Sequence, residues 1–311
     1  MTKEIYSLLT WLLLLFIVPM ASSADAVFRD PQPVIIHQLP TGSGGTPIST
    51  EEPFVSRDGR FLFFNTAQDE NQKDLHYAER SNEKWVYRGE IGPNINTKKE
   101  VEGNPTMDNH YTFLYVDSGI ESMVRVGRFV PGTGELKDLK DFTGVPDKQV
   151  ELFAQQVHGN MSVEISPSGD VIYYSRASWD LNGLSLGLIQ GADIFFVTRY
   201  NRGYVYDEAK SRRIMKNINS PELDYAASIS SDGLEIFFTR MSLSDMKPGK
   251  IRSRILMAKR KSVSEPFSKP VVIEAIGRDN FVEGPSITND GRELYYHKRV
   301  GRKFRIFKVS R

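Results

Sequence analysis

A fourteen-residue pattern that occurs five times constrains the fold of this chain more than any other feature. The copies align without gaps and begin at Glu52, Asn104, Ser162, Ala226 and Gly284. They read EPFVSRDGRFLFFN, NPTMDNHYTFLYVD, SVEISPSGDVIYYS, AASISSDGLEIFFT and GPSITNDGRELYYH. A pattern that recurs at intervals of 52 to 64 residues indicates an array of equivalent units. Five such units fill residues 27–311, which we expect to form one domain.

Each copy predicts two strands joined by a tight turn. Four copies place a glycine where the turn needs a positive φ, which glycine adopts without steric cost. The runs that follow, such as FLFF and VIYY, are too short for helices and rich in residues that favour strands. The second copy has Tyr111 at the glycine position. We expect its turn to differ, with Asn109 in the left-handed conformation.

Two further strand candidates follow each hairpin, so each unit predicts four short antiparallel strands. Such units repeated around an axis describe an all-β fold, a five-bladed β-propeller, and a linear solenoid is the competing arrangement. The last unit ends one strand short at Arg311, whereas residues 31–40 precede the first copy without a hairpin of their own. We therefore expect residues 31–40 to complete blade five, with Val34–Gln38 as its outer strand.

The motif S-x-D-G-R-x-L-x-F, seen as SRDGRFLFF and TNDGRELYY, resembles the WD-like propeller repeat of the TolB family. The resemblance covers nearly all of residues 27–311 and implies the fold far more specifically than a function. It implies six blades and a separate N-terminal α/β domain for TolB itself, and this sequence has room for neither. The sequence also has no α/β-hydrolase domain of the kind that the peptidase relatives carry.

The N-terminus has the order of a secretory signal peptide. Residues 8–20 form an apolar run that is shorter than the roughly 20 residues needed to span a bilayer. Lys3 precedes the run and the small residues ASSADA follow it. We predict that residues 1–26 are a signal peptide, cleaved after Ala24 or Ala26, and that the mature protein is periplasmic or secreted without a transmembrane segment. An uncleaved signal anchor is the alternative.

The repeat register also predicts which polar residues surround one mouth of the central channel. These residues start the innermost strand of a blade or end its second strand. They are Glu52, Glu102, Asn104, His158, Arg176, Trp179, Asp224, Tyr225, Arg240, Glu283 and Lys298. This set could bind a small polar or sugar-like ligand. It could equally form structural ion pairs, Asp224 with Arg240 and Glu283 with Lys298.

Two segments near this mouth carry further expectations. Residues 175–191, which include Trp179, form either a lid over the channel or a hairpin tip. Residues 145–159 could add a short helix on the same face.

The function is less constrained than the fold. The absence of cysteine excludes thiolate metal sites, and the five histidines form no H-E-x-x-H pair, so we predict no metal and no cofactor. His76 falls in a strand run and is expected to be packed. Residues 240–311 hold 18 Lys or Arg against 7 Asp or Glu, which favours an anionic partner.

From these features we predict an exported, non-catalytic propeller that binds an envelope protein or an anionic envelope polymer. We expect no binding of nucleic acid, because the aromatic residues follow strand and core spacing. The alternative is a carbohydrate-active hydrolase or lyase that uses carboxylates at the channel mouth, with Glu102, Asp224 and Glu283 as candidates.

Overall fold

The computed structural model describes residues 27–42, 45–69, 72–93, 95–97, 101–117, 123–146, 149–151, 156–180, 189–246, 251–278 and 280–311. The predicted signal peptide therefore lies outside the described residues. Among the residues that are described, no helix is both long and apolar enough to cross a membrane.

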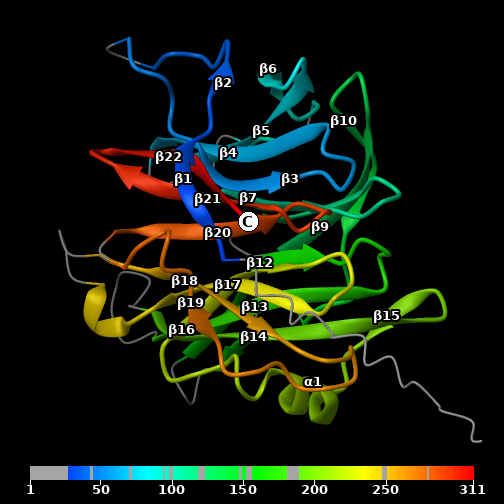
Figure 1. Cartoon of the computed structure of the whole chain (residues 1–311). Coiled ribbons are helices and arrows are strands. Elements are labelled where there is room, and N and C mark those ends of the chain that lie inside the picture. The colour runs from blue at the N-terminus through cyan, green and yellow to red at the C-terminus, as the bar shows by residue number, and fades with distance from the viewer. Residues whose placement is uncertain are drawn as a thin grey trace, which may run out of the picture.

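The strands pair as five antiparallel units, called blades one to five, which are arranged around a central axis (Figure 1). Blade one contains β3 (Glu51–Val55), β4 (Phe61–Asp69), β5 (Gln72–Ser81) and β6 (Lys84–Glu90). Blade two contains β7 (Glu102–Met107), β8 (Thr112–Asp117), β9 (Met123–Val130) and β10 (Glu135–Asp141). Blade three contains β12 (Gln156–Ile165), β13 (Val171–Asp180), β14 (Ile189–Tyr200) and β15 (Gly203–Val205).

Blade four contains β16 (Leu223–Ile229), β17 (Glu235–Met241), β18 (Arg254–Lys259) and β19 (Val271–Val272). Blade five contains β20 (Val282–Ile287), β21 (Glu293–Val300), β22 (Lys303–Ser310) and β1 (Arg29–Pro33). The innermost strands touch in the cyclic order β3, β7, β12, β16, β20 and back to β3. The repeat thus forms the predicted all-β propeller.

The remaining elements lie in connections between the strands. They are β2 (Ile36–His37), β11 (Gln149–Glu151), helix α1 (Glu208–Met215) and the 3-10 helix η1 (Leu243–Asp245). α1 starts at Asp207, whose side chain accepts a hydrogen bond from the Lys210 amide. β11 pairs with the start of β12, so the described part of residues 145–159 contains strands where a helix was expected.

The N-terminal segment joins blade five to blade one. β1 pairs antiparallel with β22, and β2 pairs in parallel with β6 of blade one. The outer strand of blade five is therefore Arg29–Pro33, and the prediction of Val34–Gln38 was wrong by several residues. The reason is burial: all five residues of β1 are exposed and suit an outer edge, whereas the apolar Val34 and Ile36 pack between blades five and one.

The core consists of apolar layers between neighbouring blades rather than one central cluster. Phe61, Phe63, Phe113 and Phe129 fill the layer between blades one and two, with ring centroids 4.9–6.3 Å apart. Similar clusters lie at the other four boundaries. The aromatic runs of the repeat are buried on both faces for this reason, as their composition predicted.

The turns of the repeat have the predicted conformation in four blades. Gly59, Gly169, Gly233 and Gly291 have φ between 70° and 77°. In blade two Tyr111 itself has a φ of 63°, so the expectation that Asn109 would adopt the left-handed conformation was wrong. The Tyr111 hydroxyl donates a hydrogen bond of 2.9 Å to Asp58 of blade one, and this contact supports the strained backbone.

A buried ion pair crosses the channel from blade one to blade three. Arg57 lies 2.8 Å from Glu164, and the two side chains are only 3% and 4% exposed. Glu164 also accepts hydrogen bonds from the Thr106 hydroxyl and the Ile229 amide, at 2.6 and 3.3 Å. Arg57 donates to two backbone carbonyls, of Met107 and Ile165. Four blades therefore converge on one pair of charges.

Removing one partner of this pair should be costly. We expect Glu164→Gln to lower the free energy of unfolding by about 3–5 kcal/mol, because Arg57 would keep a buried charge without a counterion. Urea unfolding followed by circular dichroism measures this difference. The matched control is Glu208→Gln in the exposed pair with Arg212, which should change stability by less than about 1 kcal/mol. Equal effects of the two variants would contradict the prediction.

Closure by the N-terminal segment rests on Phe28. Its buried ring contacts Phe237 of blade four edge to face, with centroids 5.9 Å apart, and the Arg311 guanidinium lies over it. Phe28→Ala should cost about 3–5 kcal/mol of stability because it leaves a cavity in this layer. Thermal unfolding of the mature chain tests this, with exposed Val27→Ala as the control. An unchanged melting temperature for Phe28→Ala would argue against closure at this seam.

Candidate active site at the channel mouth

The first residue of the repeat lies in a β-bulge that faces the channel. Glu52, Asn104, Ala226 and Gly284 have φ values of 48°, 52°, 50° and 63°, and the strand register shifts at each of them. A bulge releases a side chain from the regular alternation of its strand and re-aims it. Glu52 and Asn104 line the channel together with Glu164, around a cavity of only about 20 Å³. A ligand the size of a sugar must therefore bind at the mouth rather than inside the channel.

Glu52 is held in place by two nitrogen donors. Its Oε2 accepts hydrogen bonds of 2.7 Å from the Asn65 side chain and from the Asn104 amide. Two glycines make room for it. A Cβ at Gly103 would lie 2.5 Å from Glu52 Oε2, and a Cβ at Gly284 would lie 3.2 Å from Glu52 Cα. A half-buried carboxylate with paired donors on one oxygen keeps its other oxygen available for chemistry.

Glu283 is the second carboxylate of the mouth, and His297 connects it to Glu52. The Glu52 amide donates to His297 Nδ1 at 3.0 Å, so Nε2 carries the proton and donates to Glu283 Oε2 at 3.2 Å. The Tyr225 hydroxyl donates to Glu283 Oε1. Burial, together with the Glu283 and Glu52 charges, raises the pKa of Tyr225 well above 10, so the phenol stays a donor.

One ammonium group balances several carboxylates here. Lys73 lies 2.7 Å from Glu51 Oε2. Burial alone would lower the pKa of Lys73, but the charges of Glu52, Glu51 and Glu283 outweigh it and raise the pKa well above the usual 10.5. Within the described part of the mouth, Lys73 therefore stays positively charged beside these three glutamates.

Glu102 differs from the other carboxyl groups because it is completely buried. Its Oε1 accepts hydrogen bonds from the Thr97 amide and hydroxyl, at 3.1 and 2.8 Å. Its Oε2 has no hydrogen-bond partner among the described residues. Burial raises the pKa of Glu102 to about 7, although the Thr97 hydrogen bonds act in the opposite direction. Glu102 is thus a carboxylic acid that keeps its proton near neutral pH.

Asp224 forms the predicted ion pair with Arg240. Its Oδ1 lies 2.6 Å from Arg240 Nε, and its Oδ2 accepts from the amide and hydroxyl of Ser220. Burial raises the pKa of Asp224 to about 6, although Arg240 and Ser220 favour the ionised form. Asp224 therefore has a structural role, because Arg240 and Ser220 bind both of its carboxylate oxygens.

The other predicted residues are spread over a wider area. His158 and Arg176 line a separate pocket of about 350 Å³ between blades three and four, together with Asp193 and Glu222. Asn104 also donates to the Met161 carbonyl across the boundary between blades two and three. Glu283 bonds to His297, not to Lys298, whose ammonium lies over the Phe307 ring instead.

Trp179 lies within strand β13 rather than in a lid. It pairs with Val157 of β12 and packs against a buried cluster that includes Ala177 and Leu223. The part of residues 175–191 beyond it, 181–188, lies outside the described residues. The expectation of an aromatic lid is therefore not met by Trp179 itself.

Sequence reasoning missed two residues of the channel. Lys73 belongs to the third strand of blade one, and the predicted mouth used only the first two strands. Glu164 sits at the third repeat position, where Thr106, Ser228 and Ser286 stand in three other blades. A glutamate among small hydroxyl residues is the signal that could have identified it.

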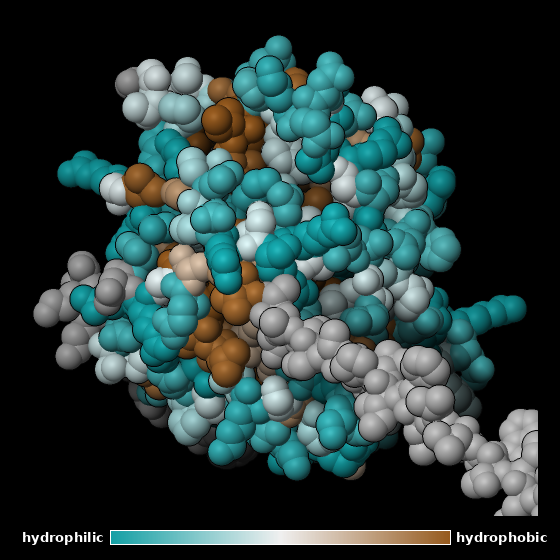
Figure 2. All heavy atoms as spheres, in the orientation of Figure 1, coloured by the Kyte–Doolittle hydropathy of each residue, from teal (hydrophilic) through white to brown (hydrophobic). Residues whose placement is uncertain are grey.

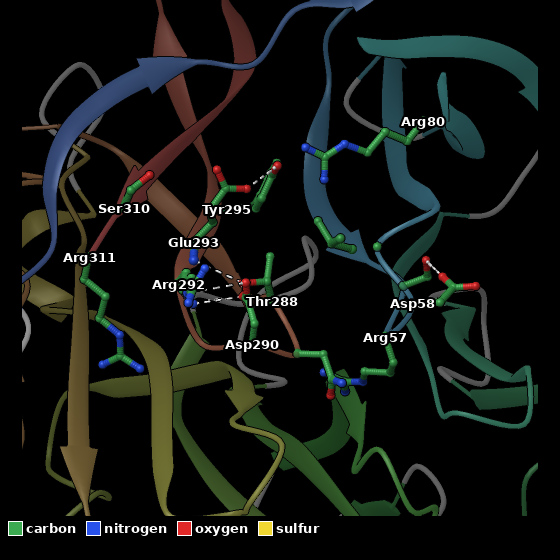
Figure 3. Close-up of a pocket in the computed structure, with 14 residues that line it drawn as sticks. Arg57, Asp58, Arg80, Thr288, Asp290, Arg292, Glu293, Tyr295, Ser310 and Arg311 are labelled. Carbon is green, nitrogen blue, oxygen red and sulfur yellow. Dashed lines mark hydrogen bonds and ion pairs between the residues drawn. The ribbon is translucent and has the colours of Figure 1, made fainter. Parts of the chain in front are cut away.

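A larger cavity, of about 580 Å³, lies at the hairpin turns between blades one and five (Figure 3). Four arginines line it, but three are engaged elsewhere: Arg57 with Glu164, Arg311 with Glu235, and Arg80 with Glu83. Among its acidic groups, Asp290 caps its own turn and Glu293 pairs with Lys308. The polar groups of this cavity thus serve the seam, and the channel mouth remains the better candidate.

No family model and no curated protein matches this chain. Solved structures do match. A GH62 hydrolase in complex with xylotriose has a TM-score of 0.53 at 9% identity, covering 92% of this chain and 96% of that chain. The α-L-arabinofuranosidase PaAbf62A from Podospora anserina, solved with cellotriose, has a TM-score of 0.51 at 10% identity, covering 91% and 95%. At these identities the likeness shows the fold alone.

TolB from Acinetobacter baumannii also matches, with a TM-score of 0.40 at 12% identity. The alignment covers 86% of this chain and 55% of TolB, so the chain spans about half the length of that protein. The propeller fold that the repeat motif predicted rests on the strand pairing and on the contacts between the innermost strands.

The prediction of a non-catalytic binding protein was wrong. The two structures that align over more than nine-tenths of both chains are a GH62 hydrolase and an α-L-arabinofuranosidase, which belong to the class named as the alternative. The charge argument for an anionic envelope partner also weakens. Several cations of residues 240–311 are paired with carboxylates, as in Arg254 with Glu222 and Arg311 with Glu235. A sequence count of charges cannot reveal such pairing.

The raised pKa of Glu102 predicts a pH dependence of stability. Between the usual pKa of 4.5 and about 7, the unfolded chain loses this proton and the folded chain keeps it, so stability falls as pH rises through that window. Glu102→Gln removes this dependence. The variant should gain on the order of 1–3 kcal/mol relative to wild type between pH 4.5 and 7.5 in urea unfolding. Exposed Glu265→Gln is the control, and parallel pH curves for wild type and Glu102→Gln would contradict the prediction.

Proposed function

We propose that the protein is a carbohydrate-active hydrolase whose substrate binds at the channel mouth. The observation that carries this proposal is a pair of unlike carboxyl groups at one end of the channel. Glu102 is buried and protonated, whereas Glu52 is a carboxylate held by Asn65 and by the Asn104 amide. Hydrolysis of a glycosidic bond uses an acid with a raised pKa and a second carboxylate. The fold-level likeness to glycoside hydrolases supports the same reaction class.

The catalytic role of each carboxyl group follows from its protonation state and from the side chains that contact it. Glu102 would donate its proton to the glycosidic oxygen, and Glu52 would act as the nucleophile or as the base for water. Access to Glu102 requires its contact with Thr97 to open. Glu283 would strengthen the negative field at the sugar ring, with His297 and Tyr225 fixing its orientation. Lys73 limits the repulsion among Glu51, Glu52 and Glu283 and so keeps them together.

The test is turnover by the mature chain on a panel of arabinoxylan, xylo-oligosaccharides and nitrophenyl glycosides. We expect Glu52→Gln and Glu102→Gln each to lower kcat/KM by about 10²–10⁴ while thermal unfolding shows a folded protein. The alkaline limb of the pH–rate profile near pH 7 should disappear only in Glu102→Gln. Glu265→Gln should match wild type. Absence of turnover on the whole panel, or full activity of both variants, would rule the proposal out.

We also infer that the protein is exported after cleavage behind residue 24 or 26. Phe28, two residues after the later of the two predicted cleavage sites, is already buried in the core of the propeller. N-terminal sequencing of the protein from its native host should give a first residue at Asp25 or Val27. A first residue at Lys3 or earlier would refute cleavage.

A further inference from the structure

Blade one carries three side chains of metal-ligating types, and the proposed hydrolase function does not use them. Asp74 and His76 stand two residues apart on β5, and His76 pairs directly with Glu90 of β6. Because side chains alternate along a strand, Asp74 and His76 share one face of the sheet, and the cross-strand partner Glu90 shares it with them. One ligand atom from each residue lies within 4.8 Å of the other two.

We propose that Asp74, His76 and Glu90 bind a divalent transition-metal ion, with Zn²⁺ as the best fit. Ligand distances of about 2.0–2.2 Å place two ligand atoms of one ion at most about 4.4 Å apart, so small side-chain shifts would bring the three atoms within reach of a single ion. One imidazole and two carboxylates suit Zn²⁺ better than Ca²⁺ or Mg²⁺, which prefer oxygen ligands alone. The three protein ligands leave the fourth tetrahedral position for water.

The surroundings of His76 orient its ring for this role. The ring stacks on Phe64 and Tyr87, with centroids 6.0 and 5.8 Å away. Nε2 lies 3.1 Å from the Thr66 hydroxyl, and Nδ1 lies 2.8 Å from the Tyr87 hydroxyl. In a neutral ring one of these hydroxyls accepts the N–H and the other donates to the lone pair. A metal ion would replace the donating hydroxyl, while the other would continue to hold the ring, as partners of metal-bound histidines do.

Burial and exposure fit an ion that enters from solvent. Asp74 and His76 are about 5% exposed, whereas Glu90 is exposed. Glu90 can therefore capture the ion at the surface and deliver it to the two inner ligands. His76 is packed, as the sequence predicted, and the proposed site departs from the prediction that the protein has no metal.

The test is isothermal titration of EDTA-treated mature chain with ZnCl₂, and then with CaCl₂. We expect one Zn²⁺ per chain, a raised melting temperature with Zn²⁺, and no comparable binding of Ca²⁺. Glu90→Gln should weaken Zn²⁺ binding at least 10-fold, and His76→Gln should abolish it. Because Glu90 is exposed, its variant tests the site even if His76→Gln fails to fold. Exposed His110→Gln and Glu83→Gln are the matched controls and should bind as wild type does.

A spectroscopic measurement separates this site from adventitious binding. Co²⁺ in place of Zn²⁺ should give a visible d–d absorption band that is lost in His76→Gln or Glu90→Gln and kept in both controls. Absence of stoichiometric Zn²⁺ binding, or binding that survives Glu90→Gln unchanged, would overturn the proposal. Neither readout depends on hydrolytic activity, so failure of the proposed function would leave the metal result intact.

Discussion

The buried ion pair between Arg57 and Glu164 is the constraint on which the channel depends. Two charges taken out of water cost several kcal/mol each unless hydrogen bonds satisfy them fully. Here the surrounding donors and acceptors come from blades one to four, including Thr106, Ile165 and Ile229. The pair can therefore form only when these blades stand in the correct order around the axis. It also fills the channel interior, and this confines any ligand chemistry to the mouth.

A second constraint acts at the mouth itself, where a bulge recurs at the first position of the repeat. The freed amides bond to the neighbouring blade: Glu52 to His297, Ala226 to Ser175, and Gly284 to Thr239. The hydrogen bond from the Glu52 amide to blade five thus offsets the strain of the positive φ at Glu52. Because the amide does the structural work, the side chain at this position can vary, and it ranges from glutamate to glycine. Chemistry at the mouth is set by these variable positions while the scaffold stays the same.

The scaffold depends on contacts within the repeat and the mouth on contacts between distant residues, and this difference explains what could be predicted from the sequence. The repeat fixed the strand pairs and the glycine turns, since both depend on contacts within fourteen residues. The exact outer strand of blade five could not be derived, because Val34 and Ile36 are drawn into a layer formed with the distant residues Trp85 and Tyr295. Likewise, the raised pKa of Glu102 depends on its burial, and the position of Lys73 depends on a third strand whose register the motif does not contain. Charge counts failed at Arg240 and Arg311 because pairing is a property of three-dimensional contacts.

The charge at the mouth also distinguishes the two functions that the sequence left open. Among the described residues of the mouth, Glu51, Glu52 and Glu283 lie around the ammonium group of Lys73, so these four groups together are net negative. Such a field repels an anionic polymer. It would stabilise the positive charge that develops on a sugar ring as its glycosidic bond breaks, which is the reaction proposed above. Some of the excess Lys and Arg residues of 240–311 form ion pairs with carboxylates, such as Arg254 with Glu222. Apolar patches that Figure 2 shows near β18 and β19 belong to the outer strands and do not alter this balance. The electrostatics of the mouth therefore favour a cationic transition state over an anionic partner.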